Sequence, residues 1–269
     1  MDVVRIPYQF LTSLWHTTWE RHLFDDVKTY VLFIGYPRSG HSLVGFLMDA
    51  HPNVIIASQT TALRYLRHGF SPRQTFFCIL ENSRKVARIG REWRRYSYAV
   101  PNQWQGRFDK LRVIGDSTGL TRVHRNPDLL KAAQEKLKGV DLKLIHVIRN
   151  PYDNISTMNR FRRQPLANTI AAYFSMCEIV EQIKRQVGPG VVYDFKHEGL
   201  IRNPQGALED LCAFLDLSAE QRYYEDCASI IFKSPHKTRA DTDWSREAIA
   251  SVRHQMDRFA FLRGYTYED

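Results

Sequence analysis

Short apolar runs recur along this chain, and stretches with helical spacing separate them. The runs cover residues 30–35, 54–57, 111–115, 142–148 and 190–195. Near-continuous apolar runs of this length are typical of strands that are buried on both faces, as in a parallel sheet. We therefore predict these segments as the strands of the fold.

The helices between these runs have marked beginnings. An N-cap residue precedes a proline at the first helical position in Asn126-Pro127, Asn150-Pro151 and Asn203-Pro204. Ser218 and Gln221 have the spacing of a capping box. Apolar residues at helical spacing predict further helices over 167–187 and 245–261.

Alternation of strands and helices predicts an α/β fold with right-handed crossovers. We expect a P-loop-like central parallel sheet flanked by helices. A chain of 269 residues can bury a full core, so we expect a single domain over 1–269, with 1–28 as an N-terminal extension. Ligands of such sheets bind beyond the carboxyl ends of the strands.

The first predicted strand leads into a loop with two glycines. The loop is Gly35-Tyr36-Pro37-Arg38-Ser39-Gly40-His41-Ser42, and Leu43, Phe46, Leu47 and Ala50 then mark one apolar helical face. A strand, a turn and a helix start together form an anion site, because backbone N–H groups converge there. The Gly35-x4-Gly40 spacing matches a nucleotide phosphate loop. The alternative is that the glycines only make a tight turn.

One difference from the usual phosphate loop is informative. A Lys followed by Ser or Thr is expected after the second glycine, where this chain has His41 and Ser42. In phosphate-loop ATPases that Lys binds the terminal phosphates and the hydroxyl holds Mg²⁺. Here the strong cation is Arg38, whose planar fork suits a terminal oxyanion. The loop therefore favours anion binding without the ATPase machinery.

A second candidate anion site follows the run 142–148. Arg149 comes at the carboxyl end of this predicted strand, Asn150 caps the next helix, and Ser156 and Thr157 lie on its second turn. A nucleotide with two separated phosphate groups would suit two such sites at one sheet edge. The alternative is a capped helix beside an Arg in a structural ion pair.

Composition adds a charge argument. The chain has 43% apolar and 25% charged residues, as soluble globular proteins do, and a net charge of +9. This charge implies an acidic partner, such as nucleic acid, a membrane surface or a polyanionic cofactor. Six basic residues line one side of a predicted helix, as a solvated face or as the lip of an acidic ligand site: Arg84, Lys85, Arg88, Arg91, Arg94 and Arg95.

Targeting and metal-binding patterns are missing from the sequence. Residues 1–28 hold no apolar stretch of signal-peptide length, and no segment is long and apolar enough to span a bilayer. The cysteines, Cys78, Cys177, Cys212 and Cys227, form no C-x-x-C pair and no metal-spaced cluster. We expect free thiols and a cytoplasmic protein.

Four segments in this order resemble the sulfotransferases that use 3′-phosphoadenosine 5′-phosphosulfate (PAPS). Residues 36–42 resemble the family's 5′-phosphosulfate loop, and 149–157 its 3′-phosphate motif, with Thr157 where Ser is usual and Ser156 as the second choice. Residues 197–204 resemble a segment that opens with a Tyr near the adenine, a place taken here by His197. Residues 233–239, followed by Trp244-Ser245, resemble the loop that closes over the nucleotide.

The resemblance implies an α/β sulfotransferase that binds PAPS, releases 3′-phosphoadenosine 5′-phosphate (PAP) and needs no metal. The residues that it implies for nucleotide binding are Arg38, Ser39, Gly40, His41, Ser42, Leu43, Arg149, Ser156, Thr157, His197, Lys237 and Arg239. Arg38, the loop amides and His41 or Ser42 would stabilise charge on the bridging oxygen as the sulfuryl group leaves.

The implied catalytic base is the open point. Within the family, residues 38–40 and 47–54 look most like the tyrosylprotein branch and its bacterial relatives, whose catalytic Glu falls at Gln59 here. A neutral amide cannot accept a proton as a carboxylate does. Three interpretations stand. Gln59 replaces a Glu to trap substrate, Gln59 only orients the acceptor, or another group is the base. The candidates for that group are His41, Asp116 and His124; Asp116 could equally cap a turn, and we expect His51 and His146 to be structural.

The acceptor is expected to lie against a helical insertion at 60–110 and part of 160–170. The insertion is rich in aromatic residues, which suit a small metabolite or natural product, although core packing is their commoner role. A glycan or peptide is the alternative acceptor. Two rival functions are a P-loop nucleotide kinase or NTPase and a non-enzymatic nucleic-acid-binding protein. We expect no nucleic-acid partner, because no interleaved aromatic and basic motif of a nucleic-acid module is present.

Overall fold

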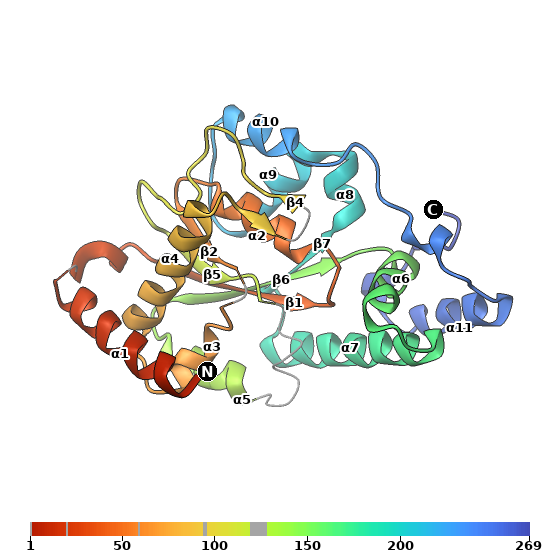
Figure 1. The fold of residues 1–269 in the computed structure, drawn as a ribbon, viewed down its shortest axis with the longest axis horizontal. Helices are drawn as coiled ribbons and strands as arrows, with labels where there is room; N and C mark the ends of the chain where they lie inside the picture. Colours follow the sequence, from red (N-terminus) through yellow and green to blue (C-terminus); the bar gives the residue numbers. More distant parts are fainter. Residues whose placement is uncertain (1, 20, 59, 94–95, 119–127) are drawn as a thin grey trace.

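A five-stranded parallel sheet forms the centre of the molecule (Figure 1). The computed structural model describes residues 2–19, 21–58, 60–93, 96–118 and 128–269. The strands, in spatial order, are β2 (Val54–Ala57), β5 (Val113–Asp116), β1 (Thr29–Gly35), β6 (Asp141–Ile148) and β7 (Val192–Lys196). Each of the five predicted strands is present, and every neighbouring pair is parallel. The predicted α/β fold is confirmed.

Helices cover both faces of this sheet. They are α1 (Asp2–Trp19), α2 (His41–Asp49), α3 (Leu63–Arg67), α4 (Pro72–Arg88), α5 (Asp128–Lys136), α6 (Pro151–Arg162), α7 (Leu166–Val187), α8 (His197–Arg202), α9 (Pro204–Phe214), α10 (Gln221–Ser229) and α11 (Arg246–Met256). A hairpin of β3 (Glu92–Trp93) and β4 (Tyr96–Ser97) and three short 3₁₀ turns complete the described elements: η1 (Arg21–Phe24), η3 (Thr238–Asp241) and η4 (Ala260–Leu262).

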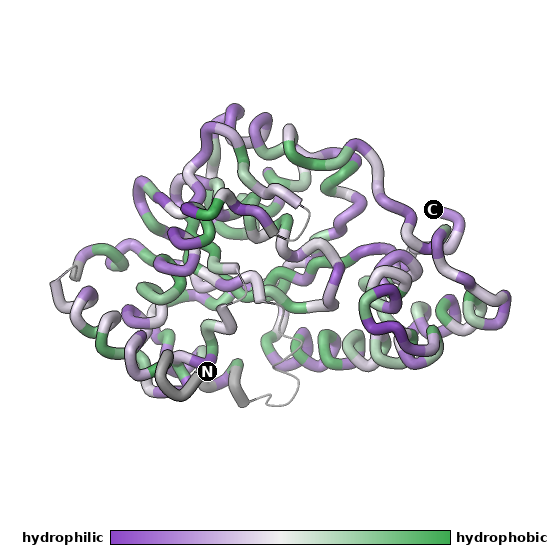
Figure 2. The backbone as a smooth tube through the Cα atoms, in the orientation of Figure 1, coloured by the Kyte–Doolittle hydropathy of each residue, from purple (hydrophilic) through white to green (hydrophobic). Residues whose placement is uncertain are grey.

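Alternate residues of β1 supply two separate cores. Tyr30, Leu32 and Ile34 pack with α3, α4 and α7 on one face, whereas Val31 and Phe33 pack with α2, α9 and α10 on the other. Every residue of β1 is buried, as its near-continuous apolar run predicts. Hydrophilic and hydrophobic residues alternate along the outer helices (Figure 2), a pattern typical of helices that bury one apolar stripe. No helix among the described residues is long and apolar enough to cross a membrane.

The capping signals have mixed outcomes. Asn150 accepts a hydrogen bond from the Tyr152 N–H and starts α6, and Asn203 does the same for α9 through the Gly206 N–H, as predicted. Asn126-Pro127 lies outside the described residues.

The prediction of a capping box at Ser218 and Gln221 is wrong. Helix α10 starts at Gln221 with Glu220 as its N-cap, and the Ser218 carbonyl instead bonds His51.

The final helix is shorter than its apolar pattern. Ser245 caps α11 as expected, but the helix ends at Met256 instead of 261. Phe259 and Phe261 continue the apolar pattern because both are buried in the core, although the chain has already turned into η4.

The predicted basic helical face breaks at Arg91. Helix α4 ends at Arg88, and Gly90 (φ +80°) turns the chain so that Arg91 is buried rather than solvated. Its guanidinium lies 2.6 Å from the Asp49 carboxylate of α2, which also accepts hydrogen bonds from Ser83 and from the Ile56 and Gly106 N–H groups. This buried pair fastens the 60–110 segment to the helix that follows the glycine loop. Arg94 and Arg95 lie outside the described residues.

Removing the cation of this pair should destabilise the protein strongly. Arg91→Ala leaves the Asp49 charge buried without its partner, so we expect a loss of about 3–5 kcal/mol of unfolding free energy in urea titrations. Arg88→Ala, at the exposed end of α4, is the matched control and should cost less than about 0.5 kcal/mol. Equal losses for the two variants would contradict the buried-pair assignment.

His51 gives a pH-dependent test of the same region. Its Nδ1 accepts from the Asn53 N–H at 3.0 Å and its Nε2 faces the Ser218 carbonyl at 3.0 Å, an arrangement that fits only the neutral ring. Burial lowers the pKa of His51 to about 4. The unfolded ring, with its ordinary pKa near 6.5, therefore binds a proton first, and stability falls as the pH drops from 6.5 towards 4.

We expect His51→Gln to remove part of this pH dependence. Between pH 7 and 5, wild type should lose about 2 kcal/mol more unfolding free energy than the variant. Urea titrations of both proteins at the two pH values measure the difference, and identical pH dependence would rule out a neutral, buried His51.

Candidate active site

The loop after β1 has the backbone of an anion site. Gly35 and Gly40 adopt φ values of +121° and +101°, and Arg38 between them adopts +73°. A Cβ on Gly40 would lie 2.4 Å from Cδ2 of His197, so this glycine is required by conformation and by space. Gly40 is the N-cap of α2 and provides no capping side chain, which leaves the first N–H groups of the helix to an anion.

The loop's side chains lie on different sides of its backbone. Ser39 is fully buried, and its Oγ has no hydrogen-bond partner among the described residues. The Arg38 guanidinium lies over the Phe161 ring, 4.1 Å from the centroid. His41 is surrounded by protein, which together with the Arg38 charge lowers its pKa to about 4, and its ring bonds the Tyr36 carbonyl. His41 is therefore neutral at pH 7. Ser42 and Leu43 follow in the first turn of α2, half-buried.

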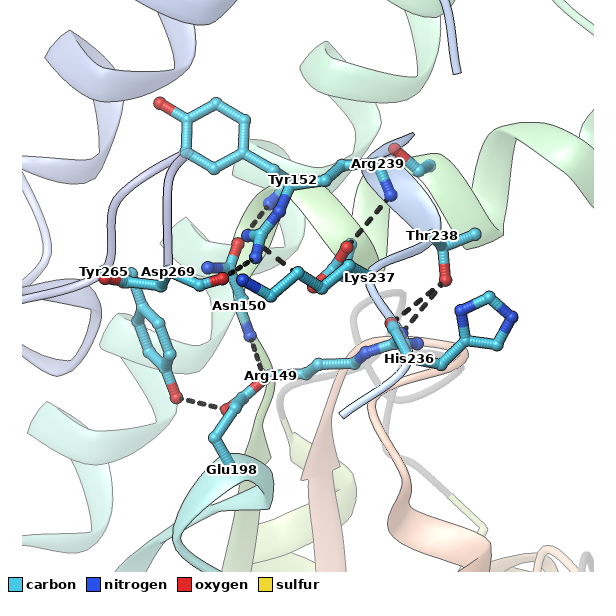
Figure 3. A network of polar contacts seen from close by, with 12 residues as sticks. Arg149, Asn150, Tyr152, Glu198, His236, Lys237, Thr238, Arg239, Tyr265 and Asp269 are labelled. Atoms are coloured by element: carbon cyan, nitrogen blue, oxygen red, sulfur yellow. Dashed lines mark hydrogen bonds and ion pairs between the residues drawn. The ribbon is translucent and has the colours of Figure 1, made fainter. Parts of the chain in front are cut away.

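Arg149 connects this loop to two distant segments. Its Nη1 donates to the Arg38 carbonyl (3.4 Å) and the Thr157 hydroxyl (3.2 Å), and its Nη2 donates to the His236 carbonyl (2.7 Å) and the Thr238 hydroxyl (3.1 Å). Figure 3 shows the guanidinium reaching the loop around Thr238. One side chain thus joins the β1 loop, helix α6 and the loop after α10.

The geometry separates the two candidate hydroxyls of α6. Thr157 contacts Arg149 and also lies 3.1 Å from the Thr238 hydroxyl. Ser156 is buried and accepts a hydrogen bond from the indole N–H of Trp244. Only Thr157 is therefore beside the guanidinium, in line with its position eight residues after Arg149.

Two further side chains, one from α6 and one from β6, bond the β1 loop. The sequence did not single them out for this role. The Asn154 amide of α6 donates to the Pro37 carbonyl at 2.9 Å. His146 of β6 is buried between the Asp194 carboxylate (2.8 Å) and the Tyr36 hydroxyl (3.2 Å). His146 thus has a structural position, as expected, and it bonds the loop through Tyr36.

His197 faces the same loop from α8. Its ring packs against Gly40, and burial together with the Arg149 charge lowers its pKa to about 4. Its Nδ1 is buried and has no partner among the described residues. A neutral polar atom is therefore held next to both anion-binding elements.

Lys237 and Arg239 lie on the other side of their loop. Arg239 is 5% exposed; its backbone N–H and guanidinium contact the Asp153 carboxylate, and the guanidinium also reaches the Thr266 and Asp269 carbonyls. In Figure 3, Lys237 extends towards Asp269, whereas the His236 ring extends in the opposite direction. The Arg149 contacts come from residues 236 and 238, which the sequence did not single out.

Asp116 is occupied by the backbone of a neighbouring segment. Its buried carboxylate accepts from the N–H groups of Thr60 (3.4 Å), Ala62 (2.6 Å) and Thr118 (2.9 Å), and from the Thr118 hydroxyl (2.7 Å). Burial raises the pKa of Asp116. The contacts match the turn-capping alternative and hold the residues that flank position 59. Gln59 and His124 lie outside the described residues.

Three aromatic side chains of this part of the molecule are exposed. Tyr96 and Phe232 are 43% and 65% exposed, with ring centroids 6.3 Å apart, and Phe161 is 54% exposed beside Arg38. Tyr96 and Phe161 fall in the predicted acceptor stretches 60–110 and 160–170, but Phe232 follows α10. The sequence pattern could not find Phe232, because isolated aromatic residues usually signal core packing.

Among the described residues, no group of three or more His, Cys, Asp or Glu side chains is placed to hold a metal ion. A parallel sheet with a glycine loop after β1 and a half-buried arginine after β6 is the arrangement of P-loop-like nucleotide-binding folds.

Comparison with known proteins identifies the family. A model of the sulfotransferase family matches residues 31–221. The chain therefore belongs to the sulfotransferase family, and the prediction of a PAPS-dependent sulfotransferase is confirmed at this level. No curated protein matches the sequence.

Solved sulfotransferase structures share the fold. The sulfotransferase domain of the Synechococcus PCC 7002 olefin synthase aligns with a TM-score of 0.55 and 15% identity, over 88% of this chain and 96% of that one. The sulfotransferase domain from the curacin biosynthetic pathway gives 0.53 and 14%, over 87% and 99%. Mouse sulfotransferase SULT7A1, complexed with PAP, gives 0.50 and 12%, over 89% and 84%.

Proposed function

We propose that this protein transfers a sulfuryl group from PAPS to a hydroxyl or amine of a small-molecule acceptor, a metabolite or natural product. The proposal rests on the Arg149 guanidinium, which donates hydrogen bonds to the β1 loop, to Thr157 and to the 236–238 loop at the same time. Two anion sites held this close suit a nucleotide with phosphates at both ends.

The proposed nucleotide contacts follow from the two sites. The 5′-phosphosulfate would bind the first N–H groups of α2, the Ser39 hydroxyl and Arg38, which can leave Phe161 to meet the charge. The 3′-phosphate would bind Arg149 and Thr157, replacing contacts that Arg149 now makes with the 236–238 loop. The adenosine would lie between the two sites, with His197, which packs against Gly40, and Leu43 as its proposed neighbours.

The reaction is an in-line displacement. The acceptor oxygen or nitrogen forms a bond to sulfur while the bond from sulfur to the bridging phosphate oxygen breaks, and that electron pair stays on PAP. Arg38 and the α2 N–H groups would stabilise the negative charge that develops on the leaving phosphate. Holding both ends of PAPS fixes the register of the sulfur against the acceptor.

The acceptor's proton needs a recipient. His41, with a pKa near 4, is a weak base at neutral pH, and the Asp116 oxygens already accept four hydrogen bonds. We therefore propose that His41 contributes hydrogen bonding and that Asp116 positions the segment around Gln59. Gln59 would orient the acceptor, whose proton would then pass to solvent, or it stands in place of a Glu base that would accept the proton.

The acceptor would lie against the exposed aromatic side chains near Arg38. Phe161 and the 60–110 segment supply flat apolar surfaces, which favour a small organic acceptor. The olefin synthase and curacin domains belong, by name, to biosynthetic systems, which agrees with such an acceptor.

Calorimetry without added metal separates the proposal from its rivals. PAP should bind, and ATP and an oligonucleotide should bind much more weakly. Metal-dependent ATP binding would favour a kinase or NTPase, and salt-sensitive oligonucleotide binding would favour a nucleic-acid protein. A panel of acceptors with labelled PAPS then identifies the acceptor class.

Arg149→Gln should weaken PAP binding by roughly 10- to 100-fold, because hydrogen bonds to charged groups are worth about 1.5–3 kcal/mol. Arg185→Gln, on the exposed face of α7, is the matched control and should bind PAP like wild type. Calorimetric titration measures both. Unchanged PAP affinity in Arg149→Gln would remove this residue from the nucleotide site.

Gln59→Glu tests the two interpretations of the base. A carboxylate at this position should raise turnover by about 10²–10⁴-fold if position 59 is next to the reacting group and lacks only the base. PAP affinity should stay unchanged, and Gln59→Ala serves as the control for orientation. A Gln59→Glu enzyme no faster than wild type would eliminate the replaced-base interpretation.

A further inference from the structure

A basic hollow lies on the side of the 233–239 segment that faces away from Arg149. It has a volume of about 680 Å³ and lies between α8, the segment after α10 and residues 263–269. Its lining comprises six cationic residues: Lys196, Arg202, Lys233, Lys237, Arg239 and Arg263. Arg149 and Thr157 are not among the lining residues, whereas Lys237 and Arg239, which the resemblance implies as nucleotide contacts, are.

The carboxylates of this hollow are already bonded to the protein. Glu198 accepts from the Asn150 N–H and the Tyr265 hydroxyl, both at 2.8 Å (Figure 3). Asp153 binds Arg239, and Asp269 accepts from the Thr266 N–H at 2.7 Å.

Most of the cations, in contrast, have no acidic partner. Lys196, Arg202, Lys233 and Arg263 are exposed, and no ion pair with another described residue is found for any of them. The Lys196 ammonium lies 5.7 Å from the centroid of the Tyr265 ring. The hollow therefore carries an excess of positive charge that the described protein does not neutralise.

We propose that this hollow is a second anion-binding site, for a ligand that carries several phosphate or sulfate groups. Cations approach from α8, from the 233–237 segment and from Arg263, so they surround the space instead of facing one point. A single small anion would engage only part of this set, whereas an oligoanion can pair with several. Arg202 and Arg263 offer planar forks that suit phosphate and sulfate oxygens.

The loop that separates the hollow from Arg149 belongs to both sites. The His236 carbonyl and Thr238 hydroxyl bond Arg149, while the alternate side chains, Lys237 and Arg239, line the hollow. A ligand in the hollow would pull on this loop, so its binding should change the affinity for PAP, and PAP should change its affinity equally. This coupling rests on the proposed function, whereas the anion site itself does not.

The test uses inorganic tripolyphosphate and a trisulfated disaccharide as probes, titrated by calorimetry into PAP-saturated protein. Wild type should bind at least one probe, and the Arg202→Gln/Arg263→Gln double variant should bind it at least tenfold more weakly. The Arg185→Gln/Arg222→Gln double variant, at two exposed arginines of α7 and α10 outside the lining, controls for net charge. Matching thermal unfolding midpoints establish that both double variants are folded.

Three results would overturn the site: no probe binding to PAP-saturated wild type, equal affinity in all variants, or probe binding that PAP abolishes by simple competition. If PAP itself fails to bind, the proposed function is wrong. Probe titrations of the same variants in nucleotide-free protein, with Arg149→Gln as the reference, then decide whether the hollow binds anions. A probe that leaves the PAP affinity equal to that in salt-matched buffer would refute the coupling alone.

Discussion

The Arg149 guanidinium is the interaction on which the site depends. It is placed at the carboxyl end of β6, and its donors reach a carbonyl of the β1 loop, a hydroxyl of α6 and a loop more than eighty residues further along the chain. Burial makes this cation expensive to hold without acceptors, so the surrounding segments must converge on it. An anion that replaces the loop contacts would meet a charge already fixed in position.

Contacts with neighbouring side chains, most of them buried, hold the rest of the site. Gly40 packs against His197, Asn154 holds the Pro37 carbonyl, and His146 bonds the Tyr36 hydroxyl from beneath. Asp116 fixes the segment around position 59 in the same way, through backbone N–H groups. These contacts hold the anion loop before any ligand binds, and such preorganisation is what stabilisation of a leaving phosphate requires.

The sequence predicts the parts of this protein that depend on local chemistry. Apolar runs identify β1, β2 and β5 because every residue of these strands is buried, and Asn150 and Asn203 mark helix starts through their own side chains. It fails where tertiary contacts decide. Arg91 has helical spacing but turns inward to Asp49, and Thr238 becomes a partner of Arg149 only because its loop returns to β6. No spacing rule records either contact.

A crystal structure with PAP bound tests the central claim most directly. The account predicts the 5′-phosphate on the first turn of α2 and the 3′-phosphate on Arg149 and Thr157, with the 236–238 loop moved off the guanidinium. PAP bound elsewhere, or an Arg149 that keeps its present contacts while the nucleotide is bound, would contradict it.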